Sequence, residues 1–130
     1  MTWLTRSWPA VAGSTVLALE GLAFVSLGLV FALGPMTTEE STLLLREIGG
    51  FLAAMGLLVL LTAYGFARQR RWSFALAITW QLMVVGIAGL VIAALPWLSA
   101  VLAILAVAGL ASAIVAARRY YAAADAARVE

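Results

Sequence analysis

The sequence contains no cysteine, no histidine and no lysine, so all 8 basic side chains are arginine. The absence of cysteine excludes disulfides, thiolate metal sites and thiol catalysis. The absence of histidine removes the commonest general base, metal ligand and pH switch. Catalysis would have to rest on a few carboxylates, tyrosines and arginines. We therefore expect a protein that is not an enzyme and that holds no metal or other cofactor.

Charge of either sign is scarce as well. Charged residues make up 11% of the 130 residues, whereas 65% are hydrophobic. A soluble domain of this length has about 25% charged and about 45–50% apolar residues. The composition excludes an ordinary water-soluble domain, a disordered chain and a nucleic-acid binder. It predicts a polytopic membrane protein with almost no soluble part. Because no linker rich in serine, glycine or proline divides the chain, we expect one domain, 1–130.

Four long apolar stretches separated by short breaks predict four transmembrane helices. A helix needs about 20 apolar residues to cross roughly 30 Å of hydrocarbon. The expected spans are 10–33, 43–67, 72–95 and 97–117, with an outer loop at 34–42 and a cytoplasmic tail at 118–130. The fold class is therefore all-α, an up-and-down bundle of four transmembrane helices. A cleaved signal peptide is the competing interpretation of the first span, but its apolar stretch is long for one.

The arginines predict the orientation. In a four-span topology seven of the eight lie on one side, namely Arg6, Arg68, Arg70, Arg71, Arg118, Arg119 and Arg128. Only Arg46 lies on the other. By the positive-inside rule both termini are cytoplasmic. The lack of lysine and the heavy use of alanine are typical of a GC-rich bacterial genome, so we expect the bacterial cytoplasmic (inner) membrane. The basic side attracts anionic lipid, and the lipid bilayer is the expected partner. Nothing resembles a basic patch for nucleic acid.

Small residues recur at helical spacing in every span and predict the packing faces. In lipid, helix association depends on close backbone approach and interhelical hydrogen bonds. The expected packing positions are Gly21, Gly28, Gly49, Ala53, Gly56, Gly89 and Gly109. The same stripes are suited to contacts between copies in a homo-oligomer or to other subunits of a membrane complex, and the sequence does not separate these uses.

Glu20 is the single charged residue deep inside an expected span. It lies eleven residues after Pro9, or roughly 16 Å into the membrane at about 1.5 Å per residue. A charged side chain at such depth costs about 2.5–3.5 kcal/mol on insertion scales, so it normally faces the protein interior. Its candidate partners are the polar side chains at similar depth: Gln81, Thr62, Tyr64 and Ser112.

Three interpretations of this polar cluster stay open. Protonated Glu20 can hydrogen-bond Gln81 and fix the helix register. Glu20 can instead be a proton or cation site in a small transporter. Thirdly, it can pair with a basic group of another subunit or of a lipid, which would make the protein an accessory subunit.

Several short motifs resemble known membrane proteins. Residues 17–24 (LALEGLAF), Tyr64-Gly65, Arg71-Trp72 and 80–82 (WQL) resemble small four-span integral membrane proteins of actinobacteria, a likeness that implies topology only. Residues 46–61 are similar to DoxX-type four-helix proteins. Small multidrug-resistance exporters also have four short helices and a membrane-embedded glutamate in the first. By that resemblance Glu20 would exchange protons against a cationic drug, with Tyr64 and Trp80 as the aromatic residues, although the family's other motifs are missing here.

The sequence therefore predicts a small four-helix integral membrane protein without enzymatic activity. We expect it to act as an accessory or structural module, or as a subunit, of unknown specific activity. The alternative is a small proton-coupled transporter of cationic or lipophilic compounds that uses Glu20, with an unknown small-molecule substrate.

Overall fold

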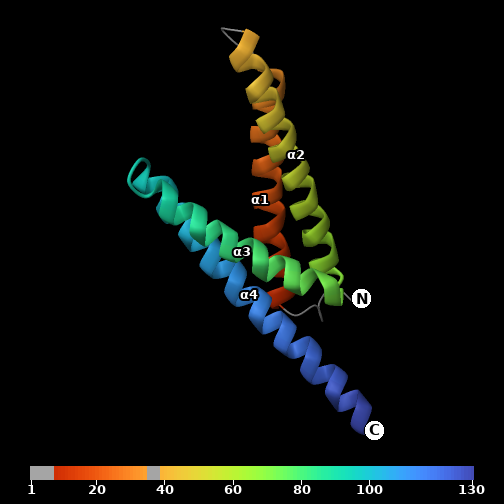
Figure 1. Cartoon of the computed structure of the whole chain (residues 1–130). Helices are drawn as coiled ribbons and strands as arrows, with labels where there is room; N and C mark the ends of the chain where they lie inside the picture. The colour runs from red at the N-terminus through yellow and green to blue at the C-terminus, as the bar shows by residue number, and fades with distance from the viewer. Residues whose placement is uncertain (1–7, 35–38) are drawn as a thin grey trace.

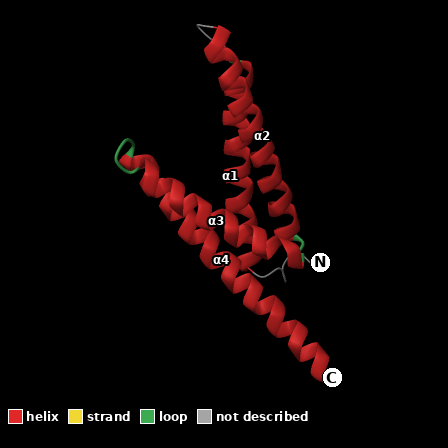
Figure 2. Ribbon diagram, in the orientation of Figure 1, coloured by secondary structure: helices red, strands yellow, loops and turns green. Residues whose placement is uncertain are grey.

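The protein is an all-α bundle of four helices in a computed structural model that describes residues 8–34 and 39–130. The helices are α1 (Trp8–Leu33), α2 (Glu39–Ala67), α3 (Arg71–Val91) and α4 (Pro96–Val129). No strand occurs among these residues, and green turns join the red helices α2 to α3 and α3 to α4 in Figure 2. Part of the expected outer loop, 35–38, and Arg6 lie outside the described residues.

The helices form two antiparallel hairpins that cross at an angle. α1 packs most extensively on α2, and α3 on α4, with smaller contacts of α1 with α4 and of α2 with α3. Figure 1 shows the hairpins meeting near the α2–α3 turn and diverging toward their other ends. The start of α1, the α2–α3 turn and the C-terminal end of α4 lie toward the same end of the bundle. This is the expected up-and-down connectivity.

Glycines bring α1 and α2 together backbone to backbone. A methyl group on Gly28 would lie 2.5 Å from the backbone nitrogen of Ala53 and 2.6 Å from the carbonyl oxygen of Gly49. Further along the hairpin, a methyl group on Gly56 would lie 2.8 Å from the carbonyl oxygen of Gly21. Real Cβ atoms do not come so close, so these positions require glycine. The predicted stripes of the first two spans therefore face each other.

Gly89 departs from the predicted packing face of the third helix. Ala77, Gln81 and Ala88 of that face are buried, but Gly89 is exposed, and a methyl group there would meet nothing within 4 Å. The reason is the rotation of about 100° between consecutive helical residues. It turns Gly89 outward when Ala88 points into the bundle.

The third helix ends four residues before the expected limit of the span. α3 stops at Val91, and the amide of Leu95 closes the turn by donating to the carbonyl of Val91 at 2.8 Å. Pro96 begins α4 and disfavours helical geometry at the preceding residue, so Leu95 has φ −139° and ψ 76°. Ser99 then ties the two helices, donating from Oγ to the carbonyl of Ala88 at 2.7 Å.

The turn between α2 and α3 closes α2 with two hydrogen bonds typical of a Schellman motif. The amide of Arg70 donates to the carbonyl of Gly65, and the amide of Gln69 to that of Phe66, both at 2.9 Å. Gln69 takes the left-handed conformation with φ 52°, which this motif requires at the position normally held by glycine. Ser73 fixes the other side of the turn, donating from Oγ to the carbonyl of Arg70 at 2.6 Å.

All four helices are long and apolar enough to cross a membrane. Large apolar side chains such as Leu33, Leu90 and Ile104 point outward, while many core positions are small. In water this arrangement would leave the largest apolar groups solvated, whereas in lipid it needs no further burial. α4, with 34 residues, is about 50 Å long and extends beyond a hydrocarbon core of roughly 30 Å. The chain is a small multi-pass integral membrane protein.

Candidate functional site

The buried carboxyl group of Glu20 joins the two hairpins. Glu20 lies on α1 with 5% of its surface exposed, opposite Trp80 and Gln81 of α3. The indole Nε1 of Trp80 donates to Glu20 Oε2 at 2.8 Å. The amide Nε2 of Gln81 donates to the same oxygen at 3.0 Å. One carboxyl oxygen thus accepts two hydrogen bonds from the neighbouring hairpin.

Aromatic packing holds Trp80 in place. Phe24, one turn after Glu20 on α1, meets the Trp80 ring edge to face with 5.1 Å between ring centroids. Two residues on α1, Glu20 and Phe24, therefore contact the same indole. Trp80 also borders a small hollow of about 110 Å³ between α2 and α3, which Met55, Thr62 and Met83 help to line.

Gln81 is completely buried, and glycine on α4 makes the space for it. A Cβ atom at Gly109 would overlap the Gln81 amide nitrogen and would lie 2.6 Å from its Cδ. The predicted packing role of Gly109 is therefore to admit a polar side chain between α3 and α4. Three helices meet here: α1 supplies the carboxyl group, α3 the donors and α4 the gap.

Two buried oxygen atoms at this site have no hydrogen-bond partner: Glu20 Oε1 and Gln81 Oε1. A carboxylate can only accept, so it could not satisfy the Gln81 oxygen. A protonated carboxyl group brings one O–H donor. The Glu20–Gln81 pair would then contain one donor and one fewer unsatisfied buried acceptor.

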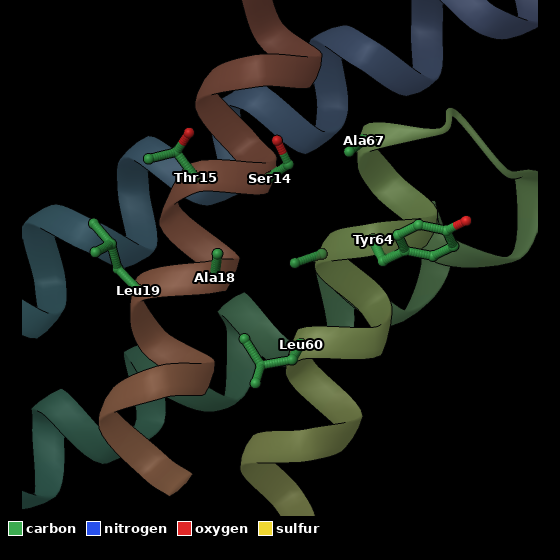
Figure 3. Close-up of a pocket in the computed structure, with 8 residues that line it drawn as sticks. Ser14, Thr15, Ala18, Leu19, Leu60, Tyr64 and Ala67 are labelled. Carbon is green, nitrogen blue, oxygen red and sulfur yellow. The ribbon is translucent and has the colours of Figure 1, made fainter. Parts of the chain in front are cut away.

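The other predicted members of the cluster form no hydrogen bond to Glu20. Thr62 and Ser112 are buried, but each hydroxyl donates to a carbonyl four residues earlier in its own helix, at 2.9 Å and 2.7 Å respectively. Tyr64 is 59% exposed. It lies on a shallow, mostly apolar groove of about 390 Å³ between α1 and α2, with Ser14 and Ala18 on the facing helix (Figure 3).

Trp80 is a contact of Glu20 that was not among its candidate partners predicted from depth alone. An indole N–H is a donor without acceptor capacity, and inside a membrane it requires an acceptor from the protein. Trp80 lies in the middle of its span and directly precedes Gln81. Those two facts were sufficient to add it as a candidate partner of Glu20.

The site offers a single carboxyl group and no metal-ligand set. Within 8–34 and 39–130, no three His, Cys, Asp or Glu residues lie together as they would around a metal ion. No protein-family model, curated protein or solved structure matches this chain.

Proposed function

We propose that this protein is a non-enzymatic accessory or structural module of a bacterial cytoplasmic membrane. The observation that carries the proposal is the double hydrogen bond from Trp80 and Gln81 to one oxygen of Glu20. Through these two hydrogen bonds the carboxyl group holds the two hairpins together. Interhelical hydrogen bonds in membranes contribute about 0.6 kcal/mol on average and at most about 1.7 kcal/mol. These hydrogen bonds therefore favour one arrangement of the helices without being the main contribution to the free energy of folding.

In this proposal Glu20 is protonated. A charged carboxylate at this depth costs about 2.5–3.5 kcal/mol, and no arginine of the chain occurs at mid-span to offset it. The neutral acid also supplies the donor that Gln81 Oε1 needs. Both considerations favour a resident structural group.

The proposed orientation has both termini in the cytoplasm. Arg68, Arg70 and Arg71 cluster at the α2–α3 turn. Arg118 and Arg119 directly precede Tyr120, whose ring packs on Phe74 near the start of α3 and thus close to the same turn. The positive-inside rule assigns such an end to the cytoplasmic side.

Self-association or assembly with other membrane subunits is part of the proposal. Gly86 and Gly89 lie one turn apart on the exposed surface of α3, with open space around them. Glycines on a lipid-facing surface allow another helix to approach closely. Purification from native membranes separates the two forms: a lone homo-oligomer argues against membership of a larger complex.

A proton-coupled transporter of cationic or lipophilic compounds is the second candidate. The two unpartnered oxygens of Glu20 and Gln81, with the hollow beside Trp80, support it. In this mechanism Glu20 would release its proton when a cation binds.

One pair of measurements discriminates the two functions. The wild-type protein and Glu20→Gln are reconstituted in vesicles with a proton gradient, and uptake of a cationic dye is followed. Glutamine keeps the accepting oxygen and adds N–H donors, so the bundle should tolerate Glu20→Gln if the role of Glu20 is purely structural. No uptake by either form, with equal thermal stability, supports the structural module. Uptake that Glu20→Gln abolishes overturns it in favour of the transporter.

A further inference from the structure

A hollow of about 500 Å³ lies at the α2–α3 turn, and neither Glu20 nor its hydrogen-bond partners line it. Its lining is polar and basic. The lining residues are Arg68, Gln69, Arg70, Arg71, Trp72 and Tyr120. Three of the eight arginines of the chain therefore border one concave surface, and none of residues 64–72 or 118–121 is acidic.

The walls of this hollow are anchored to the core. The Tyr120 ring packs on Phe74 at 5.4 Å between centroids, and Phe74 packs on the fully buried Phe66 at 5.5 Å. Trp72 lies against the backbone of α2, because a methyl group on Gly65 would come within 2.6 Å of its indole carbons. These contacts fix both aromatic walls before any ligand binds.

The backbone that carries the arginines is equally fixed. The Schellman hydrogen bonds close α2, and the Ser73 hydroxyl holds the carbonyl of Arg70 at the start of α3. Because the turn is already ordered, little conformational entropy is lost when a ligand binds there, which favours binding.

Two of the arginines use their faces for aromatic contacts. The Arg68 guanidinium lies over the Tyr64 ring, 5.3 Å from its centroid, and that of Arg71 lies over Tyr121 at 5.9 Å. A guanidinium stacked in this way keeps its N–H donors at its edge, in the planar fork that matches phosphate oxygens. The ring contacts also limit the number of side-chain positions.

The position of the hollow relative to the membrane indicates which phosphate-containing ligand it would meet. It lies at a turn between two membrane-spanning helices, bordered by Trp72 and Tyr120. Tryptophan and tyrosine are the residues enriched at headgroup level. Lipid phosphates occupy that level, and a cavity of about 500 Å³ has room for a phosphate with its glycerol.

We propose that this hollow is a binding site for the phosphate of an anionic phospholipid, held by Arg68, Arg70 and Arg71 between the walls of Trp72 and Tyr120. The acyl chains would lie along the apolar outer surface of the bundle. This site goes beyond the proposed function, and it does not depend on the role of Glu20.

Lipid retention by the purified protein tests the site. The wild-type chain in neutral detergent is titrated with phosphatidylglycerol or phosphatidylcholine, and bound lipid is counted by native mass spectrometry. The variant is Arg70→Gln/Arg71→Gln. The control is Arg118→Gln/Arg119→Gln, which removes the same charge at the same end of the bundle from residues that do not line the hollow. Both pairs are exposed, and circular dichroism verifies that each variant is folded.

The proposal predicts tighter binding of phosphatidylglycerol than of phosphatidylcholine by the wild type. Arg70→Gln/Arg71→Gln should lower the phosphatidylglycerol affinity about tenfold, since it removes the charge-assisted hydrogen bonds of two lining arginines to the phosphate. The control should change it by less than about twofold in buffer of about 0.15 M salt, because Arg118 and Arg119 do not line the hollow and act only through screened surface charge. Equal losses in the two variants would show diffuse attraction and overturn the site.

A third titration, with inorganic phosphate, distinguishes a lipid phosphate from a soluble anion. If phosphate alone binds at millimolar concentration and displaces phosphatidylglycerol with the same dependence on Arg70 and Arg71, the hollow is a site for a soluble anion, and the lipid assignment is overturned. Failure of phosphate to displace the lipid supports it. Arg68→Gln is the second variant: should the double variant unfold, loss of lipid selectivity in Arg68→Gln supports the site, and unchanged selectivity overturns it.

Discussion

The indole nitrogen of Trp80 lies 2.8 Å from the carboxyl oxygen Oε2 of Glu20, across the boundary between the two hairpins. The two residues are separated by 60 positions in the sequence. Their hydrogen bond, together with that of Gln81, is the polar contact from which the proposed role of Glu20 follows.

Trp80→Phe should weaken the junction between the hairpins while leaving most of its packing. Phenylalanine retains a ring against Phe24 but has no N–H for Glu20, so we expect the free energy of unfolding to fall by about 1 kcal/mol. Unfolding in mixed detergent micelles measures it. Trp97→Phe is the control, because Trp97 is 66% exposed. Equal effects of the two substitutions would remove the special role of the Trp80 hydrogen bond.

Gly28→Ala should separate α1 from α2. Its methyl group would meet backbone atoms of Gly49 and Ala53, which cannot rotate away, so we expect a loss of about 1–3 kcal/mol in stability. Gly50→Ala is the matched control on α2, since a methyl group on the exposed Gly50 would meet nothing within 4 Å and alanine is the better helix former. In thermal melting in detergent, Gly50→Ala should be at least as stable as the wild type. A Gly28→Ala protein as stable as the wild type would contradict the close approach.

Gly109→Ala should act through Gln81. The added methyl group would overlap the Gln81 amide and push it away from Glu20. We expect a destabilisation of about 1–3 kcal/mol. Gln81→Ala removes the obstacle, so adding Gly109→Ala to Gln81→Ala should have a much smaller effect. Additive effects in this double-mutant cycle would mean that the two residues do not compete for one space.

The absence of cysteine gives a direct measurement of topology. Single cysteines at Ala126 and Glu47, both exposed, report on the tail and on the opposite end of the bundle. With cytoplasmic termini, a membrane-impermeant thiol reagent added to intact cells should label Glu47→Cys and leave Ala126→Cys unlabelled until the cells are permeabilised. The reverse pattern would contradict the positive-inside assignment.

Much of the expected organisation was contained in composition and spacing. Insertion into lipid depends on the local apolar content of a stretch, so four helices could be predicted without knowing how they pack. The starts of α3 and α4 lie within one residue of expectation, because Arg70 and Pro96 interrupt the apolar runs locally. The glycine stripes on α1 and α2 were recognisable for the same reason, since helical spacing alone places Gly21 with Gly28 and Gly49 with Gly56 on common faces.

Which of the candidate polar residues contacts Glu20 could be determined only from the tertiary structure. Thr62, Tyr64, Gln81 and Ser112 lie at comparable depth, and depth was all that the sequence supplied. Gln81 contacts Glu20, whereas Thr62 and Ser112 bond within their own helices and Tyr64 faces outward. The outcome depends on how far each helix is rotated about its axis and on the angle at which the hairpins cross. Both are set by packing between residues far apart in the chain, such as Gly109 against Gln81, and neither follows from the periodicity of one helix.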